Sequence, residues 1–458
     1  MSGNDIIAAV ATAWGTSAIA IVRMSGEGSV AVAGKFFRGA RPLSEERARH
    51  MALGFITDEE TVIDQILAVR FDAGASYTGE ESVELHCHGG MCAAGRLFDL
   101  LTGAGARAAL PGEFTKRAFL SGRIDLAQAE AVSGIIAARS REELASASRS
   151  LQGELSSRLR ELSDSLTALR AEIEARIDFP DDVDDGEYAG FSRSLANLSS
   201  MTMSLLDRCR AGLGLRNGVR VAIVGRPNVG KSSLMNALLE RNRAIVTDIP
   251  GTTRDTLEAE FIHKGLAITL VDTAGIRDLI NGGIPDTIEE MGVARSREAI
   301  RGADFCVLVI DASSPVTNED ELVCREALLR PAILAMNKSD LPEARGGEFE
   351  EGKHFAGRVK ISALTGCGID NLKDMLIETA LGSASPSDGM MATDRMVCAL
   401  KNALGCMKDA REAMDFSRGA DAAGSLLAEA AEFLAEPSGA DASEELLDAI
   451  FGNFCVGK

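Results

Sequence analysis

Gly225-Arg-Pro-Asn-Val-Gly-Lys-Ser-Ser233 is the stretch that decides the fold in the middle of this chain. An apolar run at residues 220–224 precedes it and predicts a buried strand, and the pattern at residues 233–239 predicts a helix. The glycines therefore fall where a strand turns into a helix, and there backbone N–H groups and a helix N-terminus can hold phosphate groups. We interpret the stretch as a phosphate-binding loop rather than as a chance glycine-rich turn.

Side chains in two segments favour a guanine nucleotide. In the loop, Lys231 can reach the β- and γ-phosphate oxygens, and the Ser232 hydroxyl can bind Mg²⁺. Asn337-Lys-Ser-Asp340 follows a predicted strand at residues 332–336. A carboxylate at Asp340 can accept both N–H groups on one edge of guanine, and adenine offers no such pair. We therefore expect GTP rather than ATP.

Two further segments complete the predicted site. Ser362-Ala-Leu364 follows a strand-like run and predicts a loop over the base, and Asp272-Thr-Ala-Gly275 predicts the switch that senses the γ-phosphate through Mg²⁺. Each segment alone is typical of a solvated loop, but their order along the chain favours a GTPase. The predicted GTP-binding residues are Asn228, Val229, Gly230, Lys231, Ser232, Ser233, Thr247, Asp248, Ile249, Pro250, Gly251, Thr252, Thr253, Asp272, Thr273, Ala274, Gly275, Asn337, Lys338, Ser339, Asp340, Ser362, Ala363 and Leu364.

The predicted switches differ from those of a Ras-like timer. Where such an enzyme places a glutamine that orients the attacking water, this chain has Ile276, which has no hydrogen-bonding side chain. We expect another residue or an ion to take that role. Asn228 and the carbonyls of residues 247–253 offer oxygens for a monovalent cation such as K⁺, although asparagine is also a common turn residue. Thr253 is the expected switch ligand of Mg²⁺.

Composition bounds the class of protein. With 458 residues and 46% hydrophobic content, the chain has room for about two or three globular domains. Nine cysteines without a paired CxxC spacing favour a reducing compartment, and the sequence shows no signal peptide and no apolar run that would span a membrane. We expect a cytoplasmic protein without a membrane partner.

The net charge of −20 argues against extensive binding of nucleic acid by this chain itself. Any RNA is therefore expected to be held mainly by a partner. The alternative is that the acidic surface only keeps the protein soluble.

The periodicity of apolar residues changes along the chain. Short strand patterns at residues 18–22, 67–71 and 83–87 predict an α+β domain. Leucines at three- and four-residue steps from Leu144 to Ile177 predict one long amphipathic helix, which ends at an acidic loop at residues 180–186. A second helix is expected from about 191 to 212, and helical patterns return after the polar linker at residues 382–387.

These patterns predict a multidomain fold of class α/β plus α. We expect an N-terminal α+β domain at residues 1–120 and a discontinuous helical domain at residues 121–216 and 383–458. Neither helical part is long enough to form a bundle alone, so we expect the two to form one domain. A Ras-like P-loop GTPase domain with a doubly wound α/β sheet is then inserted between them at residues 217–382.

Three polar clusters outside the nucleotide module have open interpretations. His86, His88 and Cys92 provide a weak signal for a metal site, and packed histidines are the alternative. The charges at residues 110–126 either cap helices or belong to a site. The tail Phe454-Cys-Val-Gly-Lys458 only superficially resembles a prenylation box, because it ends in lysine.

Five segments together resemble one known family. The phosphate loop, the switch at residues 247–255, the stretches Ser76–Gly90 and Pro111–Phe119, and the Cys-Val-Gly-Lys tail are similar to those of the tRNA-modification GTPases of the MnmE (TrmE) family. The resemblance covers nearly the whole chain. It implies an N-terminal domain that binds tetrahydrofolate and forms a homodimer, and a partner, the FAD- and NADH-dependent protein MnmG (GidA).

The resemblance also implies an activity. The pair would add an aminomethyl or carboxymethylaminomethyl group to carbon 5 of the wobble uridine (U34) of tRNA, with 5-formyl- or 5,10-methylene-tetrahydrofolate as one-carbon source. GTP hydrolysis would be activated by K⁺ and by pairing of two GTPase domains. A K⁺-dependent GTPase that assists assembly, for instance of ribosomes, is the alternative function.

Residue roles follow from the same resemblance. Besides Lys231, Glu289 is the expected catalytic residue, with Glu290 as the second choice. The stretch between the two switch glycines is longer than expected for the family, and Trp14 stands where the family usually has proline. Cys455 is a candidate for the one-carbon chemistry. The implied K⁺ ligands are Asn228, Thr247, Ile249 and Thr252, and the implied folate-binding residues are Arg23, Glu84, Arg123 and Lys458.

Overall fold

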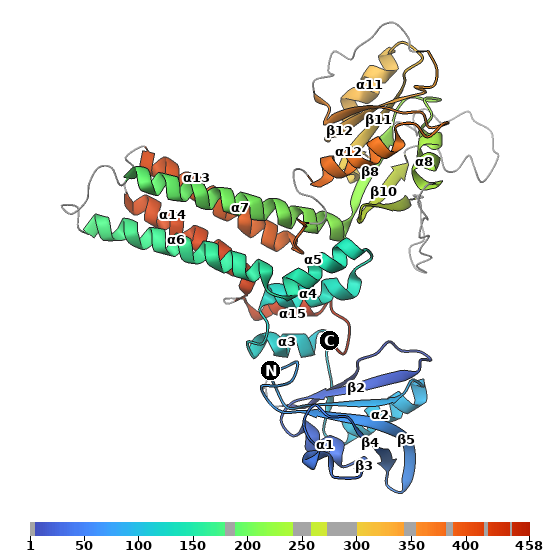
Figure 1. The fold of residues 1–458 in the computed structure, drawn as a ribbon, viewed down its shortest axis with the longest axis vertical. Helices are drawn as coiled ribbons and strands as arrows, with labels where there is room; N and C mark the ends of the chain where they lie inside the picture. The colour runs from blue at the N-terminus through green and yellow to red at the C-terminus, as the bar shows by residue number, and fades with distance from the viewer. Residues whose placement is uncertain are drawn as a thin grey trace. The chain divides into compact units, whose positions relative to one another are not determined.

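The computed structural model describes residues 5–178, 188–240, 258–272, 300–342, 354–381, 388–415, 420–439 and 442–458 (Figure 1). Its contacts divide the chain into two compact units. The first combines residues 1–133, 151–159 and 435–458, and the second combines residues 134–150 and 160–434. Each unit is thus built from segments that are distant in the sequence.

A seven-stranded sheet forms the centre of the first unit. Its strand order is β3-β4-β5-β6-β2-β1-β7, and neighbouring strands are antiparallel except for β1 and β7. The strands are β1 (Ile7–Val10), β2 (Ile19–Ser25), β3 (Phe37–Gly39), β4 (Ala52–Asp58), β5 (Thr61–Phe71), β6 (Ser82–His88) and β7 (Arg107–Ala108). Helix α2 (Met91–Gly103) packs on the sheet through buried Leu97 and Leu101, and α1 (Ser29–Gly34) contacts β3 and β6 of the same sheet. The sequence prediction of an α+β domain is confirmed.

The C-terminal segment belongs to this same unit. Helix α3 (Glu113–Leu120), the start of α4 (Leu126–Ala137) and α15 (Glu444–Phe451) share an apolar cluster that includes Leu126, Leu447 and Phe451. The cluster packs α15 against α3 and α4, and the tail after α15 contacts the N-terminal sheet at Arg23.

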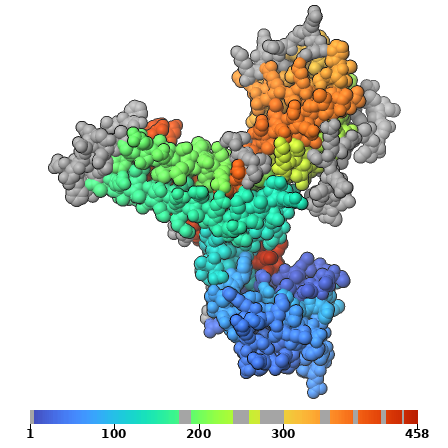
Figure 2. Space-filling view, in the orientation of Figure 1, coloured from blue at the N-terminus to red at the C-terminus, as the bar shows by residue number. Residues whose placement is uncertain are grey.

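Long helices from both sides of the nucleotide module pack together in the second unit (Figure 1). They are α6 (Glu154–Asp178), α7 (Tyr188–Asn217), α13 (Asp394–Asp415) and α14 (Ala420–Ala435). The hydroxyls of Ser199 and Thr202 on α7 lie against the sulfur of Met407 on α13, and Ser163 on α6 donates to the carbonyl of Ala431 on α14. In the space-filling view, red atoms of the C-terminal part border green atoms of α7 (Figure 2). The predicted discontinuous helical domain is confirmed.

One sequence prediction about these helices is wrong. The leucine pattern from Leu144 to Ile177 predicted a single helix, but α5 (Arg141–Leu151) ends before Gly153 and α6 begins at Glu154. Gly153 has a φ of 85°, which lies in the left-handed region and cannot continue a right-handed helix. The three- and four-residue steps continue across the break, so the apolar pattern hides it. The acidic loop at residues 180–186 lies outside the described residues.

A six-stranded sheet forms the nucleotide module, in the order β13-β12-β11-β8-β10-β9. The strands are β8 (Val219–Val224), β9 (Glu258–His263), β10 (Leu266–Asp272), β11 (Phe305–Asp311), β12 (Ala332–Asn337) and β13 (Gly357–Lys360), and only β9 is antiparallel to its neighbour. Along β8 the side chains alternate between two apolar cores: Val221 and Ile223 face one, and Ala222 and Val224 face the other. The sheet is therefore covered on both faces.

Helices cover both faces of this sheet. On one face α12 (Ile369–Leu381) and α8 (Lys231–Glu240) share a core with β8, and on the other α11 (Asn318–Ala327) packs through Cys324 and Ala327. This arrangement confirms the predicted doubly wound sheet. Helix α7 contributes Ala211 and Leu215 to the first core, so the helical part runs directly into the nucleotide module.

Two glycines give a test of the packing around α7. A Cβ on Gly212 would overlap the backbone of Met390, whereas a Cβ on Gly405 of α13 would meet open space. We expect Gly212→Ala to lower the free energy of unfolding by about 2 kcal/mol through overpacking. The matched variant Gly405→Ala should raise it by roughly 0.5–1 kcal/mol, because alanine favours the helix. Thermal unfolding followed by circular dichroism measures both, and equal effects of the two variants would contradict this packing.

Candidate functional site

The phosphate loop joins β8 to α8 in the conformation that its glycines allow. Asn228 and Gly230 have φ values of 63° and 96°, both in the left-handed region. A Cβ at Gly230 would collide with the side-chain amide of Asn337, so only glycine fits there. The first turn of α8 then closes with a 2.9 Å hydrogen bond from the Leu234 N–H to the Gly230 carbonyl. The predicted setting between strand and helix is present.

Lys231 bends back over this loop. Its Nζ donates to the carbonyl oxygens of Gly225 at 2.7 Å and Arg226 at 2.9 Å. Ser232 and Ser233 are exposed in the first turn of α8, and Val229 is buried below them. The half-buried ammonium of Lys231 and the exposed side chains of Ser232 and Ser233 thus lie at a helix N-terminus, where a phosphate is favoured.

Asn337 connects this loop to two others. Its Nδ2 donates to the Val229 carbonyl at 2.8 Å, and its Oδ1 accepts from the Ala363 N–H at 2.9 Å. The residue is 2% exposed. A buried amide that is satisfied in this way fixes the phosphate loop, the 337–340 loop and the 362–364 loop in one geometry.

The loop expected to meet the base lies at the carboxyl end of β12. Lys338 has a φ of 64°, and its Nζ forms a 2.6 Å ion pair with Asp311 at the end of β11. The Ser339 N–H donates to the Ile361 carbonyl at 3.0 Å, and Asp340 is exposed. The carboxylate of Asp340 therefore stands free of the sheet and accessible to a ligand.

The 362–364 loop is closed by its own hydrogen bonds. Ser362 is buried, its N–H donates to the Cys367 carbonyl at 2.9 Å, and its hydroxyl accepts from the Thr365 N–H at 3.2 Å. Leu364 is 86% exposed, so this loop presents an apolar side chain to the solvent next to the Asn337 bridge.

The parallel sheet explains why these loops meet. The strands β8, β11 and β12 all end at the same edge, and β8 lies between β10 and β11, where the strand order reverses. Ligands of such sheets bind at the carboxyl ends of the strands beside that reversal.

Several predicted residues lie outside the described part of the chain. For Asp272, at the end of β10, the backbone pairs with Ile223, and its side chain is among those outside. The others are Thr247, Asp248, Ile249, Pro250, Gly251, Thr252, Thr253, Thr273, Ala274, Gly275, Ile276, Glu289 and Glu290.

A second polar site lies on the N-terminal sheet. Arg23 on β2 pairs directly with Glu84 on β6, with 2.9 Å from Nε and 2.8 Å from Nη2 to the same carboxylate oxygen. Its guanidinium carbon lies 5.8 Å from the ring centre of Tyr77 and 5.7 Å from that of Phe114, within the range of cation–π contacts. The structure thus places the predicted folate residues Arg23 and Glu84 together.

The C-terminal tail reaches the same arginine. Nη1 of Arg23 donates to the Gly457 carbonyl at 3.3 Å, and the Gly112 N–H donates to the Cys455 carbonyl at 3.4 Å. A Cβ on Gly457, which has a φ of 90°, would crowd the backbone of Ala11. The tail is therefore docked next to Arg23, and it brings Lys458 and the exposed thiol of Cys455 near the sheet.

Arg123 has a different neighbour. It is exposed, and its Nη1 donates to the carbonyl of Gly74, at the start of the loop that carries Tyr77. The exposed Trp14 lies in the connection between β1 and β2.

The sequence interpretation missed an ionic network beneath this site. Arg117 contacts Asp5, Glu80 and Glu113, and Arg107 contacts Asp5 and Glu113. Burial alone raises the pKa of Glu113, but hydrogen bonds from Arg107, the Leu110 N–H and Arg117 outweigh it, and the pKa is lowered. The network fixes α3 to Asp5, just before the first strand, so the charges at residues 110–126 do more than cap helices.

The histidines have carboxylate partners. His86 lies 3.4 Å from Glu84, and His88 lies 2.7 Å from Asp64. In the parts of the chain that the structure describes, no group of three histidine, cysteine or acidic side chains gathers for a metal ion. The weak signal for a metal there has no geometric support.

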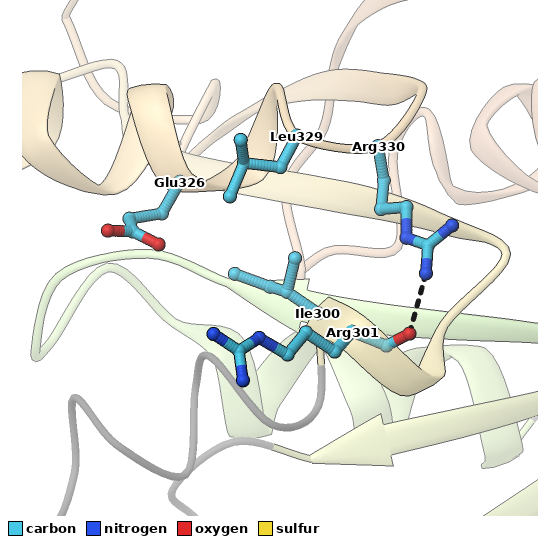
Figure 3. Close-up of a pocket in the computed structure, with 5 residues that line it drawn as sticks. All are labelled: Ile300, Arg301, Glu326, Leu329 and Arg330. Atoms are coloured by element: carbon cyan, nitrogen blue, oxygen red, sulfur yellow. Dashed lines mark hydrogen bonds between the residues drawn. The ribbon is translucent and has the colours of Figure 1, made fainter.

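A cavity of about 240 Å³ lies at the opposite end of the nucleotide module (Figure 3). Ile300, Arg301, Glu326, Leu329 and Arg330 line it, and Arg330 donates to the Arg301 carbonyl at 2.7 Å. Arg301 precedes β11 and Arg330 precedes β12, so this cavity lies at the amino ends of these strands, away from the phosphate loop.

Within the described ranges, no helix is both long and apolar enough to cross a membrane.

Comparison with known proteins places the chain in a family. The family model for the MnmE helical domain matches residues 126–455, and that for the GTP-binding protein TrmE N-terminus matches residues 6–123. The tRNA modification GTPase MnmE of Moorella thermoacetica is 41% identical over 99% of this chain and 100% of its own length, and that of Clostridioides difficile is 39% identical over 99% of both chains. Among solved structures, the G domain of the T. maritima FeoB iron transporter is 33% identical, covers 35% of this chain and 98% of its own, and has a TM-score of 0.26. This chain therefore belongs to the MnmE family of tRNA modification GTPases.

Proposed function

We propose that the chain binds and hydrolyses GTP. The observation that supports this most directly is the Asn337 bridge, which holds the phosphate loop, the exposed carboxylate of Asp340 and the 362–364 loop at one edge of the sheet. Lys231 would leave its loop carbonyls for the phosphate oxygens, which are stronger acceptors. Asp340 would accept the two N–H groups of guanine. The names of the MnmE relatives agree with this activity.

Metal ions fit the described part of this site. Ser232 presents an exposed hydroxyl in the first turn of α8, which suits Mg²⁺ together with Thr253. Asn228 presents an exposed amide in a left-handed turn, which suits K⁺ together with Thr247, Ile249 and Thr252. Bound cations would supply positive charge where negative charge develops on the phosphates.

The water that attacks the γ-phosphate needs an acceptor from this chain. We propose Glu289, with Glu290 as the second choice, because Ile276 offers no hydrogen bond at the position of the usual glutamine. Activation by pairing of two GTPase domains would bring this carboxylate and the cation into place.

We further propose that GTP hydrolysis serves modification of carbon 5 of the wobble uridine of tRNA, together with MnmG. We propose that the parts bounded at residues 120, 216 and 382 have separate tasks, with the N-terminal domain binding folate and forming the homodimer. tRNA would be held mainly by the partner, since the net charge of this chain is −20. A cytoplasmic location follows from this role.

The polar site on the N-terminal sheet supports a folate ligand. Folates combine a planar ring that carries hydrogen-bond donors with an acidic tail. Glu84 can accept from such donors, the exposed Tyr77 offers an aromatic ring, and Arg23, Arg123 and Lys458 can meet carboxylates. The exposed Cys455 thiol on the docked tail is the candidate group for one-carbon chemistry.

The cation requirement gives the first test of the GTPase. GTP turnover should be at least about tenfold faster in K⁺ than in Na⁺, because the cation would stabilise charge on the phosphates. Asn228→Ala should remove most of this difference, and Glu289→Ala should lower turnover in K⁺ without changing GDP affinity. Equal rates of the unchanged protein in both salts would refute the cation site while leaving GTP binding intact.

Folate binding is tested separately on the full chain. We expect 5-formyltetrahydrofolate to bind, and Arg23→Ala to weaken it by about tenfold or more, since a hydrogen-bonded charge is lost. The matched variant Arg70→Ala removes an arginine from β5 of the same sheet, whose ion pair is with Asp72, and should leave affinity unchanged. Calorimetry measures both. Absence of binding to the unchanged protein would favour an assembly GTPase in which this domain only makes protein contacts.

The tRNA role is tested in cells. A strain that lacks this chain should lose the modification at carbon 5 of the wobble uridine, seen by nucleoside analysis of its tRNA, and the tagged chain should co-purify with MnmG. Unchanged nucleosides in the deletion strain would refute the tRNA role.

A further inference from the structure

The segment between β11 and α11 lies beside two loops of the proposed nucleotide site. We call residues 311–320 the connector. It begins at Asp311, the last residue of β11, and ends at Asp320 in the first turn of α11. Its start is fixed to residues 337–340, which we call the base loop, by a 2.8 Å hydrogen bond from the Ala312 N–H to the Asn337 carbonyl.

One end of the connector holds the base loop. Asp311 binds Nζ of Lys338 at 2.6 Å, and its other oxygen accepts from the N–H and the hydroxyl of Ser313 at 2.9 and 2.6 Å. Lys338 has a φ of 64°, a left-handed conformation that side chains with a Cβ rarely adopt. Holding the far end of Lys338 stabilises this turn, which directly precedes the exposed Ser339 and Asp340.

The carboxyl of Asp311 is ionised in its ion pair with Lys338. Burial raises the pKa of its carboxyl, but the hydrogen bonds from Lys338 and Ser313 outweigh burial, and the pKa is lowered. Its side chain is 11% exposed, so water competes little for the ion pair.

The other end holds the phosphate loop. Arg226, the second residue of that loop, donates from Nε to Asp320 at 3.1 Å and from Nη2 to the Ser314 hydroxyl at 2.7 Å. Asp320 is buried, and its second oxygen accepts from the N–H and hydroxyl of Thr317, which forms the capping box of α11. The guanidinium of Arg226 is thus fixed to a helix end.

We propose that the connector positions the two loops of the guanine-nucleotide site, with Asp311 acting on the base loop and Ser314 and Asp320 acting on the phosphate loop. These residues act through Lys338 and Arg226 and are positioning residues, not catalytic ones. The inference rests on the proposed GTP-binding function. It assigns a role to a segment that lies outside the predicted nucleotide-binding residues.

Two nucleotides separate the roles of the two ends. Inosine diphosphate lacks the 2-amino group of GDP, so it offers Asp340 one N–H group fewer. The Kd of inosine diphosphate divided by the Kd of GDP therefore reports how well Asp340 is aligned. Asp311→Asn should weaken GDP binding by about tenfold and inosine diphosphate binding much less, which reduces the ratio. Ser314→Ala should weaken both nucleotides equally, by roughly threefold, because they share their phosphates.

A matched control lies at the other end of the same sheet. Asp304→Asn changes an exposed carboxylate that accepts from the Arg220 N–H, at the start of β8. It should leave both Kd values unchanged. Calorimetry on the full chain in Mg²⁺ buffer gives the affinities, and thermal unfolding of each variant measures stability alongside.

The outcomes decide between positioning and mere stabilisation. Equal weakening of both nucleotides by Asp311→Asn would overturn the role in base recognition, even if the protein unfolds at a lower temperature. A changed ratio in Ser314→Ala would overturn the division between the two ends. An unchanged protein that binds neither nucleotide would refute the proposed GTP site itself, and the role of the connector with it.

Discussion

The nucleotide module depends on one buried amide. Parallel strands bring their carboxyl ends to the same edge of the sheet, but nearness alone does not fix loops. Asn337 does so, because its side chain donates to Val229, accepts from Ala363, and cannot turn to water without leaving buried polar groups unpaired. Its backbone carbonyl adds the N–H of Ala312. Asn337 thus joins four segments of the chain, and it holds the exposed groups around it in a fixed geometry.

The N-terminal unit is organised around a charge instead. The guanidinium of Arg23 meets the carboxylate of Glu84, the carbonyl of Gly457 and the faces of two aromatic rings. A planar group with several donors suits such a junction, since each partner lies in a different direction. Beneath it, Arg107 and Arg117 join α3 to Asp5 in the same way. Both units thus use a polar side chain to unite segments that are distant in the sequence.

Local patterns predicted most of the fold, and distant pairings escaped them. The strand before Gly225 and the helix after Lys231 were predictable because alternation and glycine spacing are properties of neighbours in the sequence. The break at Gly153 was not, because the leucine steps continue across it. The ion pairs of Asp311 with Lys338 and of Asp5 with Arg117 join residues 27 and 112 positions apart, and no local pattern marks either one. Candidate residues for contact with a nucleotide can therefore be proposed from the sequence, whereas the ion pairs that hold their loops in place need the structure.

The docked tail has a consequence for synthesis of the chain. Arg23 and Gly457 are 434 positions apart, and the ribosome makes the first long before the second. N-terminal domains fold as they emerge during translation. The sheet around Arg23 can therefore form while the nascent chain is still growing, but its contact with Gly457 cannot form until 434 further residues have been made. A chain that stops before residue 457 would therefore contain the nucleotide module but lack the hydrogen bond to Arg23, so completion of the Arg23 site depends on residues made after the nucleotide module.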